Sequence, residues 1–254
     1  SGGDAPGMNA AIRAVVRAAS ARDMSVIGFK RGHNGPLMQS KNHTDDFEIL
    51  TNRSVSGRVH RGGTFLMTAR CLDFHKREVQ EKAIKNMRAL GLEGLVVIGG
   101  DGSFQGALRL VEQGIPCVGI PGTIDNDLYG TDTTIGYDTA LNTIMECVDK
   151  IRDTASSHER LFIVEVMGRD AGFLALNGTI ATGAEACVLP EIDPEFEKIN
   201  QFIANGLRRT KSSSIVLFAE GREKDYNIME VAEGMRQRFP ELDVRVSILG
   251  YLQR

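Results

Sequence analysis

The sequence predicts an α/β protein of two lobes, each built on a mostly parallel, doubly wound sheet. Three observations lead to this fold class. Short apolar runs alternate with helical patterns, the runs are hydrophobic throughout as in strands buried on both faces, and glycines collect in the turns after the runs. Ligands of such folds bind beyond the carboxyl ends of the strands, so we expect the site in these turns.

The individual elements follow from two periodicities. Uninterrupted apolar runs bounded by glycine or polar residues predict strands, and apolar residues at i, i+3, i+4 and i+7 predict helices. The predicted strands are 26–29, 95–98, 117–120, 161–166, 186–189, 214–219 and 244–249. The predicted helices are 9–22, 104–111, 137–152 and 228–235.

The long helix at 137–152 divides the chain into lobes. We expect one lobe at 1–136, a second lobe at 137–250, and a return to the first lobe that starts at 251–254. The glycine-rich turn at 1–7 feeds a helix without the strand that should precede it, and the last strand is followed by only a few residues. We therefore expect a chain truncated at both ends.

Composition excludes several classes of function. The chain has 254 residues, 42% hydrophobic and 25% charged, which is ordinary for a globular protein and unlike a disordered one. Its net charge of -3 comes from interleaved signs without a basic run, so nucleic acid is not an expected partner. No apolar run reaches membrane-spanning length, and the four cysteines fit neither a zinc site nor a disulfide framework. These features predict a soluble, cytoplasmic protein.

A glycine-rich turn at 99–103 is a candidate phosphate site. It lies between a predicted strand and a predicted helix, where glycine lets the backbone and the helix amides approach an anion. Asp101 is its only acid, and a carboxylate beside phosphate is typical of a Mg²⁺ ligand. The alternative is a helix-capping aspartate in a tight turn.

Two further turns carry charged side chains after strands. Asp125 and Asp127 follow one strand and can converge in a loop, where one accepts the proton of a substrate hydroxyl and the other fixes that hydroxyl or the metal. Arg169 follows another strand, and Arg70 follows a glycine turn, so that each could contact a phosphoryl group. The alternatives are a polar turn with Asx hydrogen bonds and solvated arginines.

Six motifs in one order carry a resemblance to a known family. The set resembles the ATP-dependent 6-phosphofructokinases of the bacterial type, and it extends over essentially the whole chain. The motifs are SGGDAPGMN at Ser1, GGTFL at Gly62, GGDGS at Gly99, PGTIDND at Pro121, VEVMGRDAG at Val164 and GYLQR at Gly250.

The resemblance implies the committed step of glycolysis, in which the ATP γ-phosphoryl group passes to the 1-hydroxyl of fructose 6-phosphate. The lobe at 1–136 would bind ATP and magnesium, and the lobe at 137–250 would bind the sugar phosphate. Mg²⁺ would be the cofactor and the assembly a homotetramer with shared active sites. It implies that Asp125 is the general base, that Asp127 positions the hydroxyl or the metal, and that Asp101 holds Mg²⁺. Thr123 and Arg169 would stabilise the transition state.

The implied ATP contacts are Gly3, Arg70, Cys71, Gly102 and Ser103. The implied sugar-phosphate contacts are Thr123, Asp125, Arg160, Met167, Gly168, Arg169, Glu220, Arg245, Tyr251 and Arg254, of which Arg160 and Arg245 come from a neighbouring subunit.

The sequence departs from the family pattern at Tyr251, where a histidine is common, and tyrosine brings no positive charge.

The resemblance also implies an allosteric effector site between subunits. Arg13 and Arg17 are one helical turn apart and could share a phosphate, although a solvated basic face is the alternative. The implied effector residues are Arg13, Arg17, Arg53, Arg152, Glu185 and Lys211.

Two other functions remain as alternatives. A pyrophosphate-dependent relative would have Asp at the position of Gly102 and Lys at that of Gly122, and an aspartate there would crowd and repel the ATP α-phosphate. A non-catalytic regulatory half would bind effectors only. The intact acids at 101, 125 and 127 and the intact Arg169 argue against it.

Overall fold

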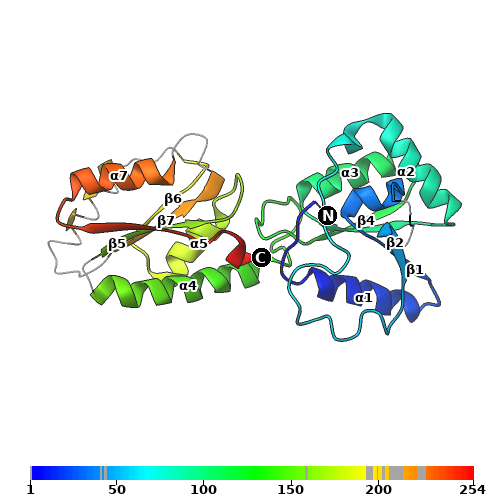
Figure 1. The fold of residues 1–254 in the computed structure, drawn as a ribbon, viewed down its shortest axis with the longest axis horizontal. Coiled ribbons are helices and arrows are strands. Elements are labelled where there is room, and N and C mark those ends of the chain that lie inside the picture. The colour runs from blue at the N-terminus through cyan, green and yellow to red at the C-terminus, as the bar shows by residue number, and fades with distance from the viewer. Residues whose placement is uncertain are drawn as a thin grey trace. The chain divides into compact units, whose positions relative to one another are not determined.

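A computed structural model describes residues 2–40, 42, 45–157, 160–192, 197–198, 200–201, 204–205, 214–221 and 227–254. The chain divides into two compact units (Figure 1). Unit 1 contains Ser1–Ile124, Leu128–Gly136 and Arg254, and unit 2 contains Asp125–Asp127 and Tyr137–Gln253. Asp125–Asp127 therefore group with the second unit, although they follow a strand of the first.

The described part of unit 1 holds two pairs of strands. β1 (Val26–Phe29) pairs antiparallel with β2 (Phe47–Leu50), and β3 (Leu95–Gly99) pairs parallel with β4 (Cys117–Pro121). Figure 1 shows α1 on one side of these strands and α2 and α3 on the other. The helices are α1 (Met8–Ser20), α2 (Arg77–Ala89) and α3 (Asp101–Val111), with 3₁₀ turns η1 (Gly32–Leu37) and η3 (Leu72–His75).

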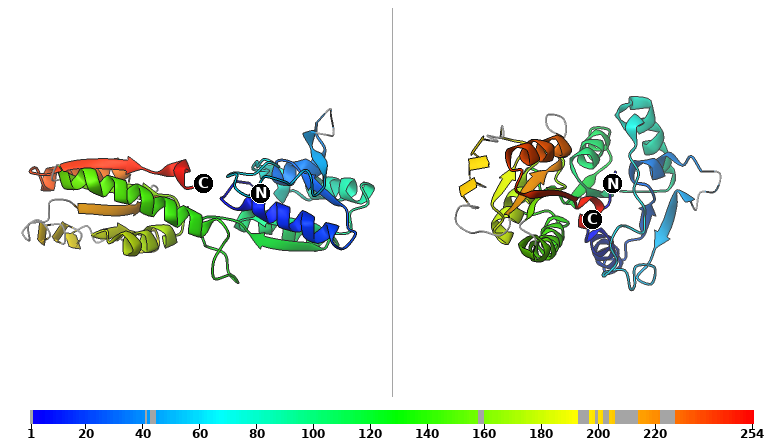
Figure 2. Two further views of the ribbon diagram at one scale, coloured as in Figure 1. Left: turned by 90° about the horizontal axis from the view of Figure 1, so that it is seen from below. Right: turned by 60° about the vertical axis from the view of Figure 1, so that its left-hand side comes forward.

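The described part of unit 2 holds a four-stranded parallel sheet in the order β6-β7-β5-β8. One face carries α7 and the other carries α4 and α5 (Figures 1 and 2). Parallel strands covered on both faces must be apolar throughout, and all six residues of β7 are buried. The elements are α4 (Tyr137–Ser157), β5 (Arg160–Val166), α5 (Phe173–Thr182), β6 (Ala186–Val188), β7 (Ser214–Ala219), α7 (Ile228–Arg238), β8 (Asp243–Ile248) and the 3₁₀ turn η5 (Gly250–Gln253).

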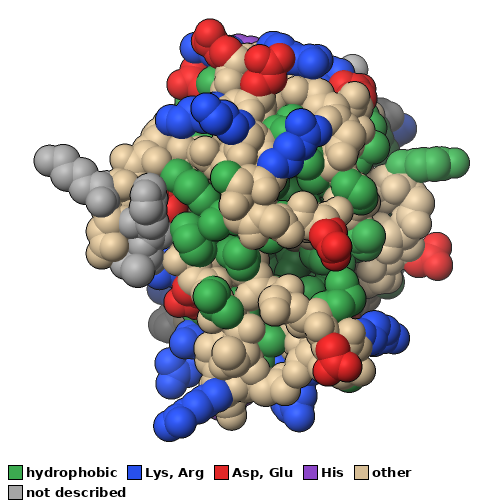
Figure 3. All heavy atoms as spheres, turned by 90° about the vertical axis from the view of Figure 1, so that its right-hand side faces the viewer, with side chains coloured by type: hydrophobic (Ala, Val, Ile, Leu, Met, Phe, Trp, Pro, Cys, Tyr) green, Lys and Arg blue, Asp and Glu red, His purple; other side chains and the backbone are tan. Residues whose placement is uncertain are grey.

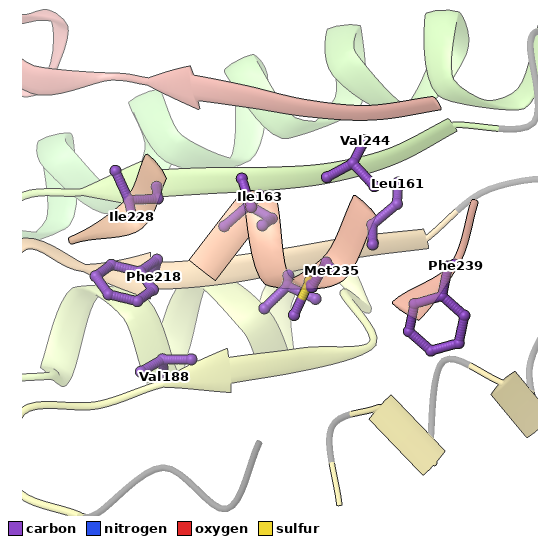
Figure 4. Close-up of a cluster of buried hydrophobic side chains, with 10 residues drawn as sticks. Leu161, Ile163, Val188, Phe218, Ile228, Met235, Phe239 and Val244 are labelled. Carbon is purple, nitrogen blue, oxygen red and sulfur yellow. The ribbon is translucent and has the colours of Figure 1, made fainter. Parts of the chain in front are cut away.

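One hydrophobic core cluster of unit 2 lies between this sheet and α7 (Figure 4). Leu161 and Ile163 alternate along β5 and point to the same face, where Ile228 and Met235 of α7 cover them. Each fully buried side chain of this size contributes about 1.5 to 3 kcal/mol. The packing therefore holds β5 and its two parallel neighbours rigidly, which fixes where the segments after β5 and β7 begin.

Every strand expected from the sequence is present, with ends within one residue of the expected ones. The expectation of mostly parallel sheets is confirmed, and β1 with β2 is the antiparallel exception. The sequence reading missed β2, α2 and α5. β2 is four residues long with a glutamate in it, and α5 lacks a polar face, so neither element has the periodicity that identified the others.

Unit 1 also contains an apolar cavity of about 410 Å³, lined by residues of α1, β1 and β3 among others. Figure 3 shows hydrophobic side chains grouped around a hollow on the face that it draws. Among the described helices, none has the length and apolar character that a membrane span requires.

Candidate active site

α1 holds the glycine loop at 61–65 through one buried side chain. Asn9, only 3% exposed, donates from Nδ2 to the carbonyl oxygens of Arg61 at 2.9 Å and Gly62 at 3.2 Å. Its Oδ1 accepts a 2.9 Å hydrogen bond from the amide of Phe65. A buried amide with three partners fixes a loop that would otherwise have several conformations.

Arg254 lies against the first turn of the chain. Its Nη1 donates to the carbonyl of Asp4 at 3.0 Å and lies 3.9 Å from the Asp4 carboxylate. A Cβ at Gly3 would be 2.9 Å from the same Nη1, so the glycine leaves room for the guanidinium. Unit 1 thus brings together a residue expected at the transferring phosphate and one expected at the sugar phosphate. Arg70 is close by, because its Cγ would lie 3.7 Å from a Cβ at Gly2.

The glycine-rich turn after β3 leads directly into α3, which begins at Asp101. The N-cap residue is Gly100, which has no side chain to hydrogen-bond to the first turn of the helix. Asp101 and Gly102 are exposed, whereas Ser103 is buried. Thr123 lies two residues after the parallel neighbour β4, and its Cβ would lie 3.3 Å from a Cβ at Gly100. The partial positive charge of the α3 N-terminus therefore faces a region with an acid and a hydroxyl, as an anion site with a metal requires.

The donor set fits a magnesium ion that arrives with phosphate. Among the described residues, no group of three or more His, Cys, Asp or Glu side chains could hold a metal by itself. Mg²⁺ is commonly bound by one or two carboxylates together with substrate phosphate oxygens and water. The single exposed carboxylate of Asp101 suits that mode and would not form a permanent metal centre.

In unit 2 the turn after β5 has an unusual backbone. Gly168 has φ of +149° and Arg169 has φ of +57°, a left-handed conformation that costs a residue with a Cβ about 1 to 2 kcal/mol. Gly221 packs against the backbone of Arg169, so Glu220 and Arg169 belong to adjacent segments. The Arg169 side chain is 63% exposed, and its Nε is 3.7 Å from Asp170. Asn126, between the two candidate catalytic acids, is also left-handed.

Arg160 and Arg245 converge on one carboxylate at the other end of the sheet. Asp243 accepts from Arg160 Nε at 2.9 Å, and its second oxygen is 2.8 Å from Arg245 Nε. The hydrogen bonds and charge of Arg245, followed by those of Arg160, lower the pKa of Asp243. Arg160 starts β5, so it is about 20 Å from the carboxyl end of that strand at 3.3 Å per residue. The two arginines are therefore remote from Arg169 of the same chain.

The remaining predicted residues have mixed surroundings. Met167 and Gly168 directly follow β5, and Tyr251 is 84% exposed on η5. Cys71 is half-buried, which raises the pKa of its thiol. Of the expected effector residues, Arg13 and Arg17 lie on α1, and Arg53 is exposed in a loop tied to the end of α1 by Asn52 and Ser20. Arg152 donates to the carbonyl of Thr182 at 2.7 Å, and Glu185 accepts from the amide of Ile215 at 2.6 Å. Lys211 lies outside the described residues.

Sequence reasoning overlooked three side chains that shape these sites, namely Asn9, His33 and Asp243. A signal existed for Asp243, because residues two apart on a strand share a face and Asp243 is two before Arg245. The role of Asn9 requires the tertiary contact with the glycine loop. His33 stacks on Phe74, with ring centroids 4.4 Å apart, and its Nε2 is 3.1 Å from the carbonyl oxygen of Ser103. Burial lowers the pKa of His33, which keeps the imidazole neutral.

Two units that combine helices with mostly parallel strands define an α/β protein. The phosphofructokinase family profile matches residues 1–254, and the chain belongs to this family. It is 56% identical over 255 residues to the ATP-dependent 6-phosphofructokinase 2 of Bacteroides thetaiotaomicron, and 52% identical over 254 residues to the ATP-dependent 6-phosphofructokinase of Oceanobacillus iheyensis. Both alignments cover 100% of this chain and 76% of the relative. Among solved structures, Pichia pastoris phosphofructokinase in the T-state matches with a TM-score of 0.92 and 36% identity, over 100% of this chain and 29% of that one.

The close approach of His33 to Gly106 predicts that the effect of Gly106→Ala on the free energy of unfolding changes sign when His33 is replaced by alanine. A Cβ at Gly106 would lie 2.6 Å from His33 Nε2, and stacking on Phe74 restricts the movement of the ring. We expect Gly106→Ala to lower the free energy of unfolding by about 1 to 3 kcal/mol. With His33→Ala in place, the same change should raise it by about 0.5 to 1 kcal/mol, because alanine is the better residue within a helix. Denaturant unfolding of the four proteins measures both values, and equal signs would refute the contact.

Proposed function

We propose that the protein is an ATP-dependent 6-phosphofructokinase. It transfers the γ-phosphoryl group of ATP to the 1-hydroxyl of D-fructose 6-phosphate and gives fructose 1,6-bisphosphate and ADP. The observation that carries the proposal is the contact between Arg254 and Gly3. It puts the cation that binds the phosphate of the acceptor beside the backbone turn that binds the transferring phosphoryl group. The named activity of relatives above 50% identity supports it. We place the enzyme in the cytoplasm, as for other glycolytic steps.

Asp125 acts as the general base in this reaction. Its carboxylate accepts the proton of the 1-hydroxyl while the oxygen forms a bond to the γ-phosphorus, and the bond from that phosphorus to the bridging oxygen of ADP breaks. Asp127 orients the hydroxyl, and Thr123 and Arg169 donate hydrogen bonds to the phosphoryl oxygens. In a loose transition state most catalysis comes from such positioning and charge stabilisation. Mg²⁺ held through Asp101 would neutralise charge on the ATP phosphates.

The ATP side of the site belongs to unit 1. Gly3, Arg70, Cys71, Gly102 and Ser103 contact the nucleotide, and the open N-terminus of α3 provides backbone donors. A pyrophosphate-dependent enzyme would need a lysine at position 122. A Cβ at Gly122 would be 3.1 Å from Ile98 Cγ2 and 3.2 Å from Met8 Cε, so that the surroundings would have to move. This crowding favours ATP as the donor.

The assembly is a homotetramer that shares its sugar-phosphate pockets between subunits. The support is the position of Arg160 and Arg245, about 20 Å along the sheet from Arg169 of the same chain. One phosphate cannot contact both ends of the sheet, so the pair serves a neighbouring subunit. Asp243 forms ion pairs with both arginines until a dianionic phosphate replaces it as their partner.

Met167, Gly168, Glu220 and Tyr251 complete the acceptor side within each chain. We also propose an effector site that uses Arg13, Arg17 and Arg53, together with Arg152, Glu185 and Lys211, for a phosphorylated ligand. Arg17 and Arg53 are exposed, which leaves their guanidinium groups accessible to an anion.

Replacing the base should remove chemistry and leave binding. We expect Asp125→Ser to lower kcat at least about a hundredfold with little change in KM, because loss of a general base costs about 10² to 10⁴ in rate. Steady-state kinetics with ATP and fructose 6-phosphate measure both constants. Asp149→Ser, an exposed acid on α4, is the matched control and should keep the parental kcat. A near-normal kcat for Asp125→Ser would rule out this assignment.

A series of substitutions at Gly102 tests whether crowding or charge determines the use of ATP as the phosphoryl donor. Apart from its two chain neighbours and the backbone of its own helix, no heavy atom of the described residues lies within 4 Å of a Cβ built there, so each variant should fold. An acid in the first turn of a helix is also favourable. We expect Gly102→Ala to keep most ATP-dependent activity, Gly102→Asn to keep less, and Gly102→Asp to lose it. Assays with ATP and with pyrophosphate make the test. A parent that prefers pyrophosphate would contradict the donor argument.

Mixed assemblies test the shared pocket. Asp125→Ser and Arg245→Ala damage different halves of a site, so dissociating and reassociating them together should restore some activity at saturating ATP. Alone, Arg245→Ala should raise the KM for fructose 6-phosphate about tenfold or more, since a hydrogen bond to a charged group contributes about 1.5 to 3 kcal/mol.

The matched control mixes Asp125→Ser with Arg169→Ala, which damage the same half and should restore nothing. Equal activity in the two mixtures, with mixed assemblies verified by mass spectrometry, would overturn the shared pocket.

A further inference from the structure

Gln253, in the 3₁₀ turn after β8, is a polar side chain with 1% exposure and two defined partners. Its Oε1 accepts a 3.2 Å hydrogen bond from the amide of Met167, 86 residues earlier. Its Nε2 donates to the carbonyl of Gly250 at 3.1 Å. Both ends of the amide are therefore used inside unit 2.

The bond to Met167 replaces a missing bond of the sheet. The β5–β8 ladder continues one step past β8, since the amide of Leu249 donates to the carbonyl of Glu165 at 3.0 Å. In a regular parallel ladder the next donor, Met167 N–H, would bond to the Leu249 carbonyl. That carbonyl instead accepts from Leu252 at 3.1 Å as the chain turns. The Gln253 side chain supplies the acceptor that the backbone has lost.

The position of this bond gives it a functional consequence. Met167 is the last residue before Gly168 and Arg169, whose positive φ angles take them out of any regular element. The turn has a hydrogen bond of its own, from the amide of Ala171 to the carbonyl of Gly168 at 3.0 Å, but the ladder with β8 ends before it, so its direction depends on the residue that starts it. The half-buried amide of Met167 would lose its acceptor with Gln253, so loss of Gln253 would favour a rearranged turn.

We propose that Gln253 is a positioning residue for fructose 6-phosphate binding, because its buried amide joins Met167 to Gly250 and thereby fixes the Met167–Arg169 turn. The inference rests on the proposed function, which assigns this turn to the sugar phosphate. Gln253 acts through that turn and does not itself touch the substrate.

The kinetic test compares two variants of nearly equal size. Gln253→Leu removes both hydrogen bonds, and Gln253→Glu keeps an acceptor for Met167 N–H while losing the donor to Gly250. We expect the leucine variant to raise the KM for fructose 6-phosphate about tenfold, with the KM for ATP changed less than about twofold. The glutamate variant should lie closer to the parent.

The matched control is Gln80→Leu in unit 1. Gln80 is also buried, with Nε2 donating to the carbonyl of Phe74 at 2.8 Å and Oε1 accepting from Gln113 at 2.7 Å. It should lower Tm to a similar extent without a selective rise in the fructose 6-phosphate KM. If Gln253→Leu leaves that KM unchanged, or raises the KM values for fructose 6-phosphate and ATP in parallel, the positioning role is refuted.

Hydrogen exchange gives a readout that needs no activity. In the parent protein the Met167 amide should be protected, and Gln253→Leu should accelerate its exchange at least about tenfold, whereas Gln80→Leu should not. Unchanged protection in the leucine variant would overturn the proposal. A parent without fructose 6-phosphate kinase activity would refute the proposed function instead, and the exchange result would still test the hydrogen bond.

Discussion

The parallel pairing of β5 with both β7 and β8 is the constraint on which the sites of unit 2 depend. In a parallel sheet the carboxyl ends of all strands lie at one edge. The turns after β5 and β7 are therefore adjacent in space although they are far apart in the sequence. The same pairing brings the amino ends of β5 and β8 together, where Arg160 and Asp243 are register partners. One sheet thus builds two polar edges of different composition, separated by an apolar core that leaves neither edge free to move towards the other.

The two edges use charge in different ways. At the amino edge, one carboxylate holds two guanidinium groups, which lowers the cost of bringing the cations together before a ligand arrives. At the carboxyl edge, Arg169 is mostly exposed and its position is set by backbone conformation. The two edges therefore hold their cations by different means, one by an ion pair and the other by the path of the backbone.

The sequence was sufficient to predict what depends on local pattern. Continuous apolar runs identified the parallel strands, and the 3.6-residue stripe identified the helix at Tyr137 although it extends further than expected, to Ser157. Side-chain contacts between distant segments could not be predicted in this way. Asn9 reaches a loop more than fifty residues away, and Arg254 reaches a carbonyl 250 residues away, so that periodicity contains no information about either. The close contacts of Gly3 with Arg254 and of Gly106 with His33 likewise join residues that are far apart in the sequence.

The left-handed backbone of Arg169 bears on how this protein could be engineered. Glycine or asparagine would relieve the unfavourable conformation at that position, so either residue would be favoured by any selection for thermal resistance alone. Such a selection would report a more stable protein while removing the guanidinium that the proposed function places at the transferring phosphoryl group. Libraries aimed at thermal resistance should therefore hold position 169 constant and search the fully buried positions of the sheet instead.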